Sequence, residues 1–158
     1  MSKEFTHINK KDVPYMVSVQ EKKATNRMAR ARATVLLNEE ILNQFEGNEI
    51  ATKKGPVFQT AIIAGILGAK KTGDLIPLCH PIGMDHCEID IQMENGEVLI
   101  DCVARVKAKT GIEMEALTGA TIAALTIYDM CKSFGHEILI KDIKLMEKRG
   151  GKKDFLRQ

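Results

Sequence analysis

Asp129 and Lys132 are three residues apart near the end of a long apolar segment, so on a helix they share one face. An acid and an amine in such surroundings form either a structural ion pair or an acid–base couple, and burial would lower the pKa of the lysine toward neutrality. A lysine near a helix C-terminus is also favourable by itself. The residues alone therefore leave both interpretations open.

The motif LIPLCHPI places Cys79 and His80 between two prolines. Each proline fixes its own φ and disfavours helix at the residue before it, which predicts a stiff, non-helical strap. The braced imidazole of His80 could donate to a phosphate or exchange a proton, or it could be a structural histidine with both nitrogens satisfied. The backbone amides of Leu78 and Cys79 could contact the same ligand.

His86 and Cys87 follow soon after this strap and raise the possibility of a zinc site. However, adjacent residues project in different directions, His86 and Cys87 would lie on opposite faces of a strand, and no standard ligand spacing is present. We therefore expect Cys87 to belong to the core, and we expect no bound metal and no cofactor.

Glu113 and Glu115 are two residues apart just before the long apolar segment. On a helix they would point in widely different directions, whereas in an extended segment both could face one site. Acidic residues at a helix start are also common, because they complement the helix dipole.

Lysines next to glycines offer two possible phosphate contacts. Lys53 and Lys54 precede a Gly-Pro helix start, while Lys148 and Lys152 flank a Gly pair. Helix N-termini and lysines both suit phosphate groups, although most lysine clusters are solvated surface.

Composition restricts the classes of function. The net charge is +2 and aromatic residues make up 4% of the chain, so a nucleic-acid partner is not expected. No apolar run reaches membrane length, and the first residues contain no export signal. The four cysteines lack CxxC spacing and are expected to be free thiols. These features predict a cytoplasmic protein that binds neither nucleic acid nor membranes.

Apolar periodicity predicts the elements that must position these side chains. Asn95-Gly96 is a type I′ turn signal, and folding the chain there makes every inward pair of the hairpin apolar. In the last strand the alternation slips at Lys141-Asp142, which predicts a bulge. The expected elements are a strand over 31–37, a helix from the N-cap Asn38 to Gly47, a helix over 56–70, a hairpin around 87–104, an apolar helix over 114–132 and a strand over 136–148.

This order predicts an α+β fold, the ferredoxin-like βαββαβ arrangement, with an antiparallel sheet and helices packed on one face. Residues 1–158 would form a single domain, with a mobile tail at about 149–158. Gly65, Gly68 and Ala61 would allow the helix over 56–70 to pack closely against a neighbour. The apolar helix could also face a second subunit.

Four stretches occur in order: LIPLCHPI, KTGIEMEALT, AALTIYDMCK and the glycine-lysine tail. Together they resemble the molybdenum-cofactor biosynthesis protein C family, the cyclic pyranopterin monophosphate synthases. The resemblance extends from FTHIN to GGKK, and the two central motifs are long and specific.

The resemblance implies that 3′,8-cyclo-7,8-dihydroguanosine 5′-triphosphate is converted to cyclic pyranopterin monophosphate and pyrophosphate, without a cofactor. It also implies a homohexamer, a trimer of dimers in which subunits share the site. Carried over by residue, the family's catalytic groups match Asp129, Lys54 and Lys132. The substrate contacts that match are Leu78, Cys79, His80, Glu113, Met114, Glu115, Lys148 and Lys152.

Some residues depart from the family pattern. Pro56 stands where the family often has Asp after the Lys-Gly pair, Ser18 replaces a common Asp, and Gly73 replaces a bulkier or polar residue. The tail also lacks a Ser-Gly element. The alternatives to the synthase are a ferredoxin-like module that binds a guanine nucleotide without converting it, and a zinc protein.

Overall fold

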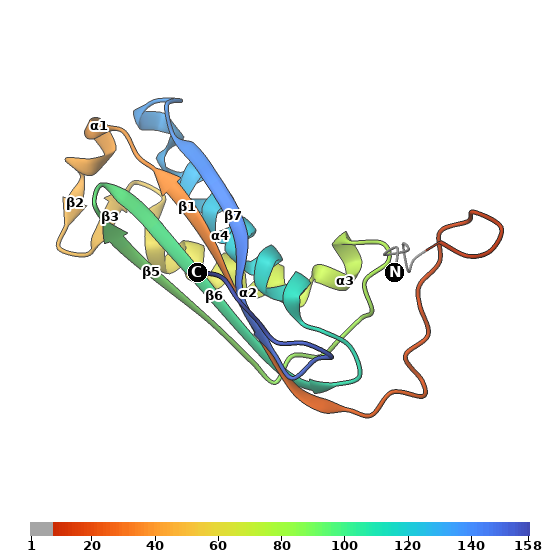
Figure 1. Ribbon diagram of the computed structural model, residues 1–158. Coiled ribbons are helices and arrows are strands. Elements are labelled where there is room, and N and C mark those ends of the chain that lie inside the picture. Colours follow the sequence, from red (N-terminus) through yellow and green to blue (C-terminus); the bar gives the residue numbers. More distant parts are fainter. Residues whose placement is uncertain (1–7) are drawn as a thin grey trace.

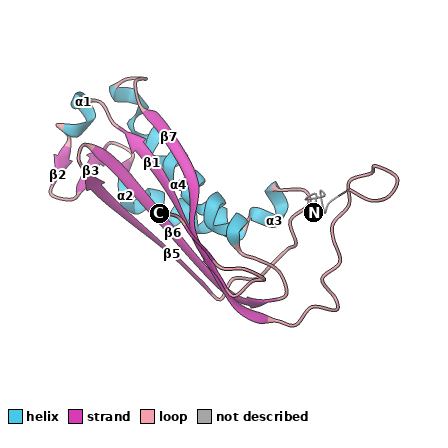
Figure 2. Ribbon diagram, viewed as in Figure 1, coloured by secondary structure: helices cyan, strands magenta, loops and turns pink. Residues whose placement is uncertain are grey.

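The structure is a computed structural model, and it describes residues 8–158. A sheet forms one layer and the long helices α2 and α4 form the other (Figure 1, Figure 2). The elements are β1 (Thr25–Leu36), α1 (Glu39–Leu42), β2 (Phe45–Glu46), β3 (Glu49–Thr52), β4 (Gly55–Pro56), α2 (Val57–Lys70), α3 (Thr72–Leu75), β5 (His86–Glu94), β6 (Glu97–Ala108), α4 (Glu113–Cys131), the 3₁₀ turn η1 (Lys132–Phe134), β7 (Leu139–Arg149) and β8 (Phe155–Leu156).

The main sheet has the strand order β5-β6-β1-β7-β8, and all of its pairs are antiparallel. The two helix connections, one before β5 and one before β7, place α2 and α4 on the same face. The predicted ferredoxin-like α+β fold is therefore confirmed. A second, small sheet of order β2-β3-β4 lies between α1 and α2.

The β5–β6 hairpin has the register that its apolar pattern predicted. Ile89 lies opposite Cys102, and Ile91 lies opposite Ile100. Asn95 and Gly96 both have positive φ, at 51° and 81°, as a type I′ turn requires. The Asn-Gly turn thus sets which residues of both strands face the helices.

The close approach of α2 and α4 depends on glycine, as predicted. A Cβ atom on Gly65 would lie 2.8 Å from the carbonyl oxygen of Gly119, and one on Gly68 would lie 2.6 Å from Ile122. Ala61 is fully buried in the same helix. The small side chains allow the two backbones to pack directly against each other.

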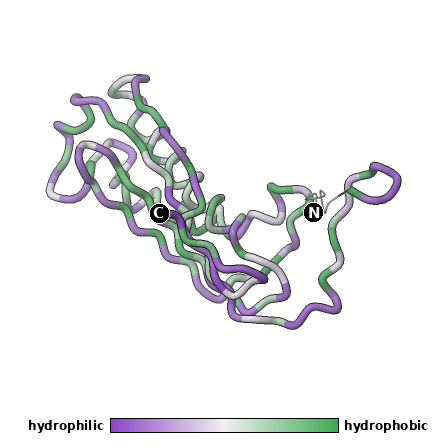
Figure 3. Tube along the Cα trace, in the orientation of Figure 1, coloured by the Kyte–Doolittle hydropathy of each residue, from purple (hydrophilic) through white to green (hydrophobic). Residues whose placement is uncertain are grey.

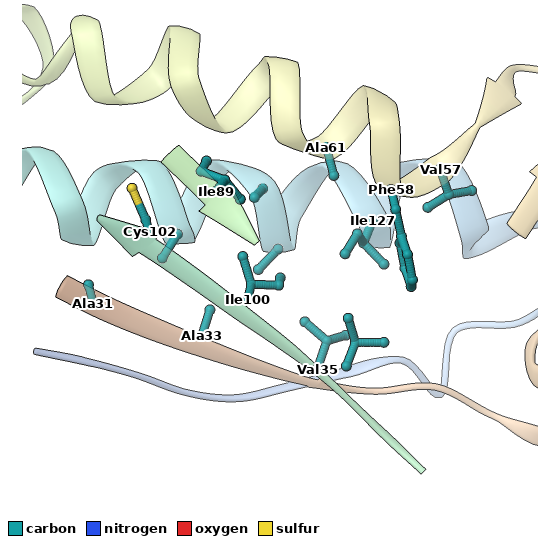
Figure 4. Close-up of a cluster of buried hydrophobic side chains, with 14 of the residues drawn as sticks. Ala31, Ala33, Val35, Val57, Phe58, Ala61, Ile89, Ile100, Cys102 and Ile127 are labelled. Atoms are coloured by element: carbon teal, nitrogen blue, oxygen red, sulfur yellow. The ribbon is translucent and has the colours of Figure 1, made fainter. Parts of the chain in front are cut away.

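The core fills the space between the sheet and these helices (Figure 4). Alternate residues of β1 point inward, and Ala31, Ala33 and Val35 are completely buried. They meet Ile100 from β6 and Ile127 from α4. Because this core contacts both long helices, it fixes where the ends of α4 lie relative to the sheet.

Three sequence predictions need correction. The strand expected over 31–37 begins six residues earlier, since β1 spans Thr25–Leu36. The helix predicted to run to Gly47 ends at Leu42, although Asn38 caps it as expected, with Oδ1 accepting from Ile41 N at 2.9 Å. The φ of +66° at Gly47 serves the β2–β3 turn instead of a helix end. In β7 the predicted bulge at Lys141 is confirmed, but a second irregularity occurs at Met146, which the apolar pattern did not reveal.

Residues 8–24 run as an arm beyond the sheet, and the loop at its far end is hydrophilic (Figure 3). At the other end of the chain, the segment expected to be mobile turns back after β7 and pairs with it as β8. The mobility of this tail stays a prediction. Among the described residues, no helix is long and apolar enough to cross a membrane.

Candidate active site

Lys54, Asp129 and Lys132 come together at the C-terminal end of α4. The Lys132 ammonium donates to Asp129 Oδ1 at 2.7 Å, across one turn of helix. Lys54, from the turn between β3 and β4, donates to Asp129 Oδ2 at 3.3 Å and to its carbonyl oxygen at 3.1 Å. The fold therefore places two amines on one carboxylate, although Lys54 is 75 residues away in sequence.

This Lys–Asp–Lys cluster lies at the surface of the chain. The side chains of Lys54, Asp129 and Lys132 are 54%, 59% and 49% exposed. The hydrogen bond from Lys132 is the main cause that lowers the pKa of Asp129, and the same bond raises the pKa of Lys132. The alternative in which burial lowers the pKa of Lys132 is therefore wrong for the chain on its own, since the dominant influence is the adjacent carboxylate.

A cavity of about 290 Å³ lies at the opposite, N-terminal end of α4. The strap supplies one wall, and the first turn of α4 supplies another. Lys22, Val17 and Val19 from the arm and Thr110 and Gly111 before the helix complete the lining. The wall residues predicted from sequence are Leu78, Cys79, His80, Glu113, Met114 and Glu115.

His80 connects the strap to the arm. Its Nε2 lies 2.7 Å from the carbonyl oxygen of Val17, and since a carbonyl only accepts, Nε2 carries the hydrogen. The imidazole therefore has a structural partner and also borders the cavity, while its contact with a ligand stays a prediction. The strap is non-helical from Ile76 onward, as its prolines predicted.

Glu115 is the one carboxylate buried in the cavity wall among the described residues, and only 3% of its surface is exposed. Desolvation raises its pKa, with a smaller contribution from the charge of Glu113. Burial, followed by the charge of Glu115, also raises the pKa of the Cys79 thiol. Cys79 is therefore a protonated lining group at neutral pH, without thiolate character.

Glu113 begins α4, so the alternative in which this segment stays extended is wrong. Both glutamates nevertheless border the same cavity, because the helix starts directly at its wall. Glu113 Oε1 accepts from Lys148 of β7 at 2.9 Å, which places one tail lysine beside the cavity. Lys152 is exposed in the following turn and forms no ion pair within residues 8–158.

The cavity and the Lys–Asp–Lys cluster are far apart within one chain. Glu115 and Asp129 are at opposite ends of α4, and a rise of 1.5 Å per residue separates them by about 21 Å. Neither Lys54, Asp129 nor Lys132 borders the cavity. A ligand that fills the cavity therefore does not reach the Lys–Asp–Lys cluster of the same chain.

The residues considered for zinc do not converge. Cys87 packs against the core and its Sγ lies 4.0 Å from Cys102 Sγ, as the core prediction required. His86 and Glu88 both lie on the face of β5 opposite to Cys87, and His86 Nε2 is 3.5 Å from Glu88 Oε2. No group of three or more histidine, cysteine or acidic residues in the described part of the chain could hold a metal ion.

Six cavity-lining residues were missed by the sequence reasoning: Val17, Val19, Lys22, Ile82, Thr110 and Gly111. The arm carries neither a distinct motif nor a regular element, so nothing local marked it. Only the bond from His80 to Val17 shows that the arm lies over the strap.

Comparison with known proteins identifies relatives over nearly the whole chain. The model of the MoaC family matches residues 16–151. The protein named cyclic pyranopterin monophosphate synthase from Xanthomonas campestris pv. campestris strain 8004 is 44% identical over 98% of this chain and 94% of its own length.

Two longer relatives also match. The molybdenum cofactor biosynthesis bifunctional protein of Synechocystis is 48% identical over 95% of this chain, and molybdenum cofactor biosynthesis protein 1 of Dictyostelium discoideum is 43% identical over 94%. The chain spans only 45% and 26% of those two proteins. From residue 16 to residue 151 it matches one family throughout, and it therefore belongs to the MoaC family.

Proposed function

We propose that this chain is a cyclic pyranopterin monophosphate synthase. It converts 3′,8-cyclo-7,8-dihydroguanosine 5′-triphosphate to cyclic pyranopterin monophosphate and pyrophosphate, an early step of molybdenum cofactor biosynthesis. Its membership of the MoaC family and its likeness to a synthase of almost the same length support this activity. The single observation that carries it is the pair of amines from separate elements on one carboxylate.

The Lys–Asp–Lys cluster is suited to the proton transfers of this reaction. In the cyclisation, a sugar-derived hydroxyl attacks the innermost phosphate, the bond to pyrophosphate breaks, and the hydroxyl gives up its proton. Lys54 and Lys132 act as acid–base groups, and Asp129 orients them or serves as a base. The raised pKa of Lys132 keeps it protonated at neutral pH, which suits a proton donor near phosphate.

The cavity at the other end of α4 holds the substrate. The strap residues Leu78, Cys79 and His80 and the helix residues Met114 and Glu115 contact the guanine-derived ring system. The tail lysines Lys148 and Lys152, with Glu113 positioning Lys148, approach the triphosphate.

In the proposed enzyme, two subunits form one complete site. The distance of about 21 Å along α4 between Glu115 in the cavity wall and Asp129 in the Lys–Asp–Lys cluster supports an arrangement in which a partner brings its own cluster to the cavity. Exposed Ile63 and Leu67 on α2 and Leu125 on α4 offer apolar surface for such a partner. We propose a homohexamer built as a trimer of dimers, located in the cytoplasm.

Direct assay of the purified chain tests this function. Incubation with the cyclo-dihydro-GTP intermediate should release pyrophosphate and form the pyranopterin product. A guanine nucleotide-binding module without activity would bind the intermediate but leave it unchanged. Absence of turnover by well-folded, assembled protein would therefore reject the synthase.

A further inference from the structure

The N-terminus of α2 is capped from outside the helix. The N-cap position is occupied by Pro56, which makes no side-chain cap hydrogen bond. A helix leaves its first backbone N–H groups without intrahelical partners, and Ser, Thr, Asp or Asn at the N-cap usually accept from the second or third of them. In this chain the capping oxygens come from Glu49, at the start of β3.

Both carboxylate oxygens of Glu49 are used. Oε1 accepts from Phe58 N at 2.7 Å, and Oε2 accepts from Gln59 N at 3.1 Å, so the second and third residues of α2 are both satisfied. Oε1 also accepts from Ile50 N at 2.8 Å. The negative charge is favourable at this end of the helix dipole. One carboxylate therefore fastens the start of β3 to the start of α2.

Lys54 lies at the tip of the hairpin that this carboxylate holds. Thr52 Oγ1 accepts from Lys54 N at 3.1 Å and donates to the carbonyl of Gly55 at 3.0 Å. Gly55 has a φ of +113°, pairs with Thr52 and leads through Pro56 directly into α2. The backbone position of Lys54 is thus set on one side by β3 and on the other by the first turn of α2.

We propose that Glu49 is a positioning residue for Lys54. Its carboxylate replaces the missing N-cap side chain of α2, and by joining the helix to β3 it holds the Lys54 amine against Asp129. The proposal rests on the proposed function, because it takes the catalytic role of Lys54 from there. Glu49 itself makes no hydrogen bond to Lys54, Asp129 or Lys132.

Glu49→Ala is compared with Glu46→Ala, which removes an exposed carboxylate from the residue paired with Glu49 across β2 and β3. Turnover of the cyclo-dihydro-GTP intermediate is measured well below the melting temperature of each variant, with folding checked by circular dichroism. We expect kcat of Glu49→Ala to fall about 10- to 100-fold, as displacement of a reacting group does, with little change in KM. Glu46→Ala should keep the kcat of the unchanged chain.

A second substitution that restores the cap of α2 separates the capping role of Glu49 from other effects of its negative charge. In the double variant Glu49→Ala with Pro56→Asp, the aspartate supplies an ordinary N-cap side chain next to Lys54 and Gly55. We expect kcat to recover most of its loss, while Pro56→Asp alone stays near the unchanged chain. If Glu49→Ala does not fold, Glu49→Gln, which keeps an acceptor oxygen, takes its place in the kinetic comparison.

Three results would overturn the proposal. Folded Glu49→Ala with a lower melting temperature but full kcat would make Glu49 a structural cap only. A loss of kcat that Pro56→Asp does not restore would reject the capping route. Lys54→Ala is assayed alongside: if that variant keeps full activity, the proposed site itself fails, whereas inactive Lys54→Ala beside active Glu49→Ala rejects only the positioning role.

Discussion

The two ends of α4 differ in burial and in charge. At the N-terminal end, Glu115 is 3% exposed and its pKa is raised by desolvation. At the C-terminal end, Asp129 is 59% exposed and its pKa is lowered by two ammonium groups. The cavity lies at one end without the amine pair, and the amine pair at the other end does not border that cavity. The difference agrees with our proposal that each chain carries two half-sites, which a partner subunit completes.

The largest loss of activity is expected for substitutions at the C-terminal end of α4. Asp129→Asn or Lys132→Ala should lower turnover about 1,000-fold or more, within the usual range for loss of general acid–base groups. Pyrophosphate release measures the loss, and melting and assembly should change little because these side chains are exposed.

Lys71→Ala is the matched control, since Lys71 and Asp74 form another exposed ion pair with the same spacing. Its activity should stay unchanged. Retained activity in the Asp129 and Lys132 variants would remove them from the catalytic groups.

Mixing two inactive variants tests whether the half-sites combine between subunits. Glu115→Gln disables the cavity and Asp129→Asn disables the amine cluster. If each site uses both subunits of a dimer, random reassembly of equal amounts should restore about a quarter of full activity, because half the dimers are mixed and each has one intact site.

The control for this experiment is the same mixture without dissociation and reassembly, which should stay inactive. Reassembled mixtures that show no recovery would indicate that cavity and cluster act within one chain, contrary to their separation along α4.

A smaller effect is expected where β7 meets the cavity. Lys148→Ala removes an amine placed by Glu113, and it should raise KM about tenfold with little change in kcat if Lys148 contacts a phosphate group. Steady-state kinetics separates the two constants. Lys144→Ala, which breaks another ion pair on the same strand, should leave both constants unchanged. A fall in kcat alone would instead place Lys148 in the chemistry.

The smallest expected effect is a change in the stability of the chain, caused by substitution of Glu115 at the N-terminal end of α4. A carboxyl group whose pKa is raised on folding binds its proton more tightly in the folded chain, so its contribution is fully present below its ordinary pKa of 4.5 and is lost as pH rises. At neutral pH, Glu115→Gln should therefore stabilise the chain by ~1 kcal/mol, because an uncharged amide costs less to bury.

Thermal melting at several pH values from acidic to mildly alkaline checks this expectation. The gain of Glu115→Gln over the unchanged chain should grow as pH rises. A gain that stays constant, or a destabilised variant at neutral pH, would show that the Glu115 carboxylate is satisfied by its surroundings.

Local pattern was sufficient for much of the fold. The alternation along β5 and β6 and the Asn-Gly turn specified the hairpin register residue by residue, because a one-residue slip would turn every apolar side chain outward. The glycines of α2 indicated a close contact, which Gly119 provides. Short elements were harder to predict: α1 ended early because the β2–β3 turn, which pairs with residues further along the chain, used Gly47.

In the candidate site, too, some features follow from the local sequence and others follow only from tertiary packing. The sequence by itself determined which residue types were available: two prolines to brace His80, an i,i+3 acid and amine in Asp129 and Lys132, and the motifs that resemble the synthase family. It also determined that the Asp129 and Lys132 side chains meet, since helical spacing alone brings them together.

Only the tertiary structure decided which distant residues join them. It brought Lys54 to Asp129, Val17 to His80 and Glu49 to the start of α2. It also placed the cavity and the amine cluster at opposite ends of one helix. The physical reason is that local periodicity determines which face a side chain occupies, whereas the packing of α2 and α4 against the sheet determines which faces meet.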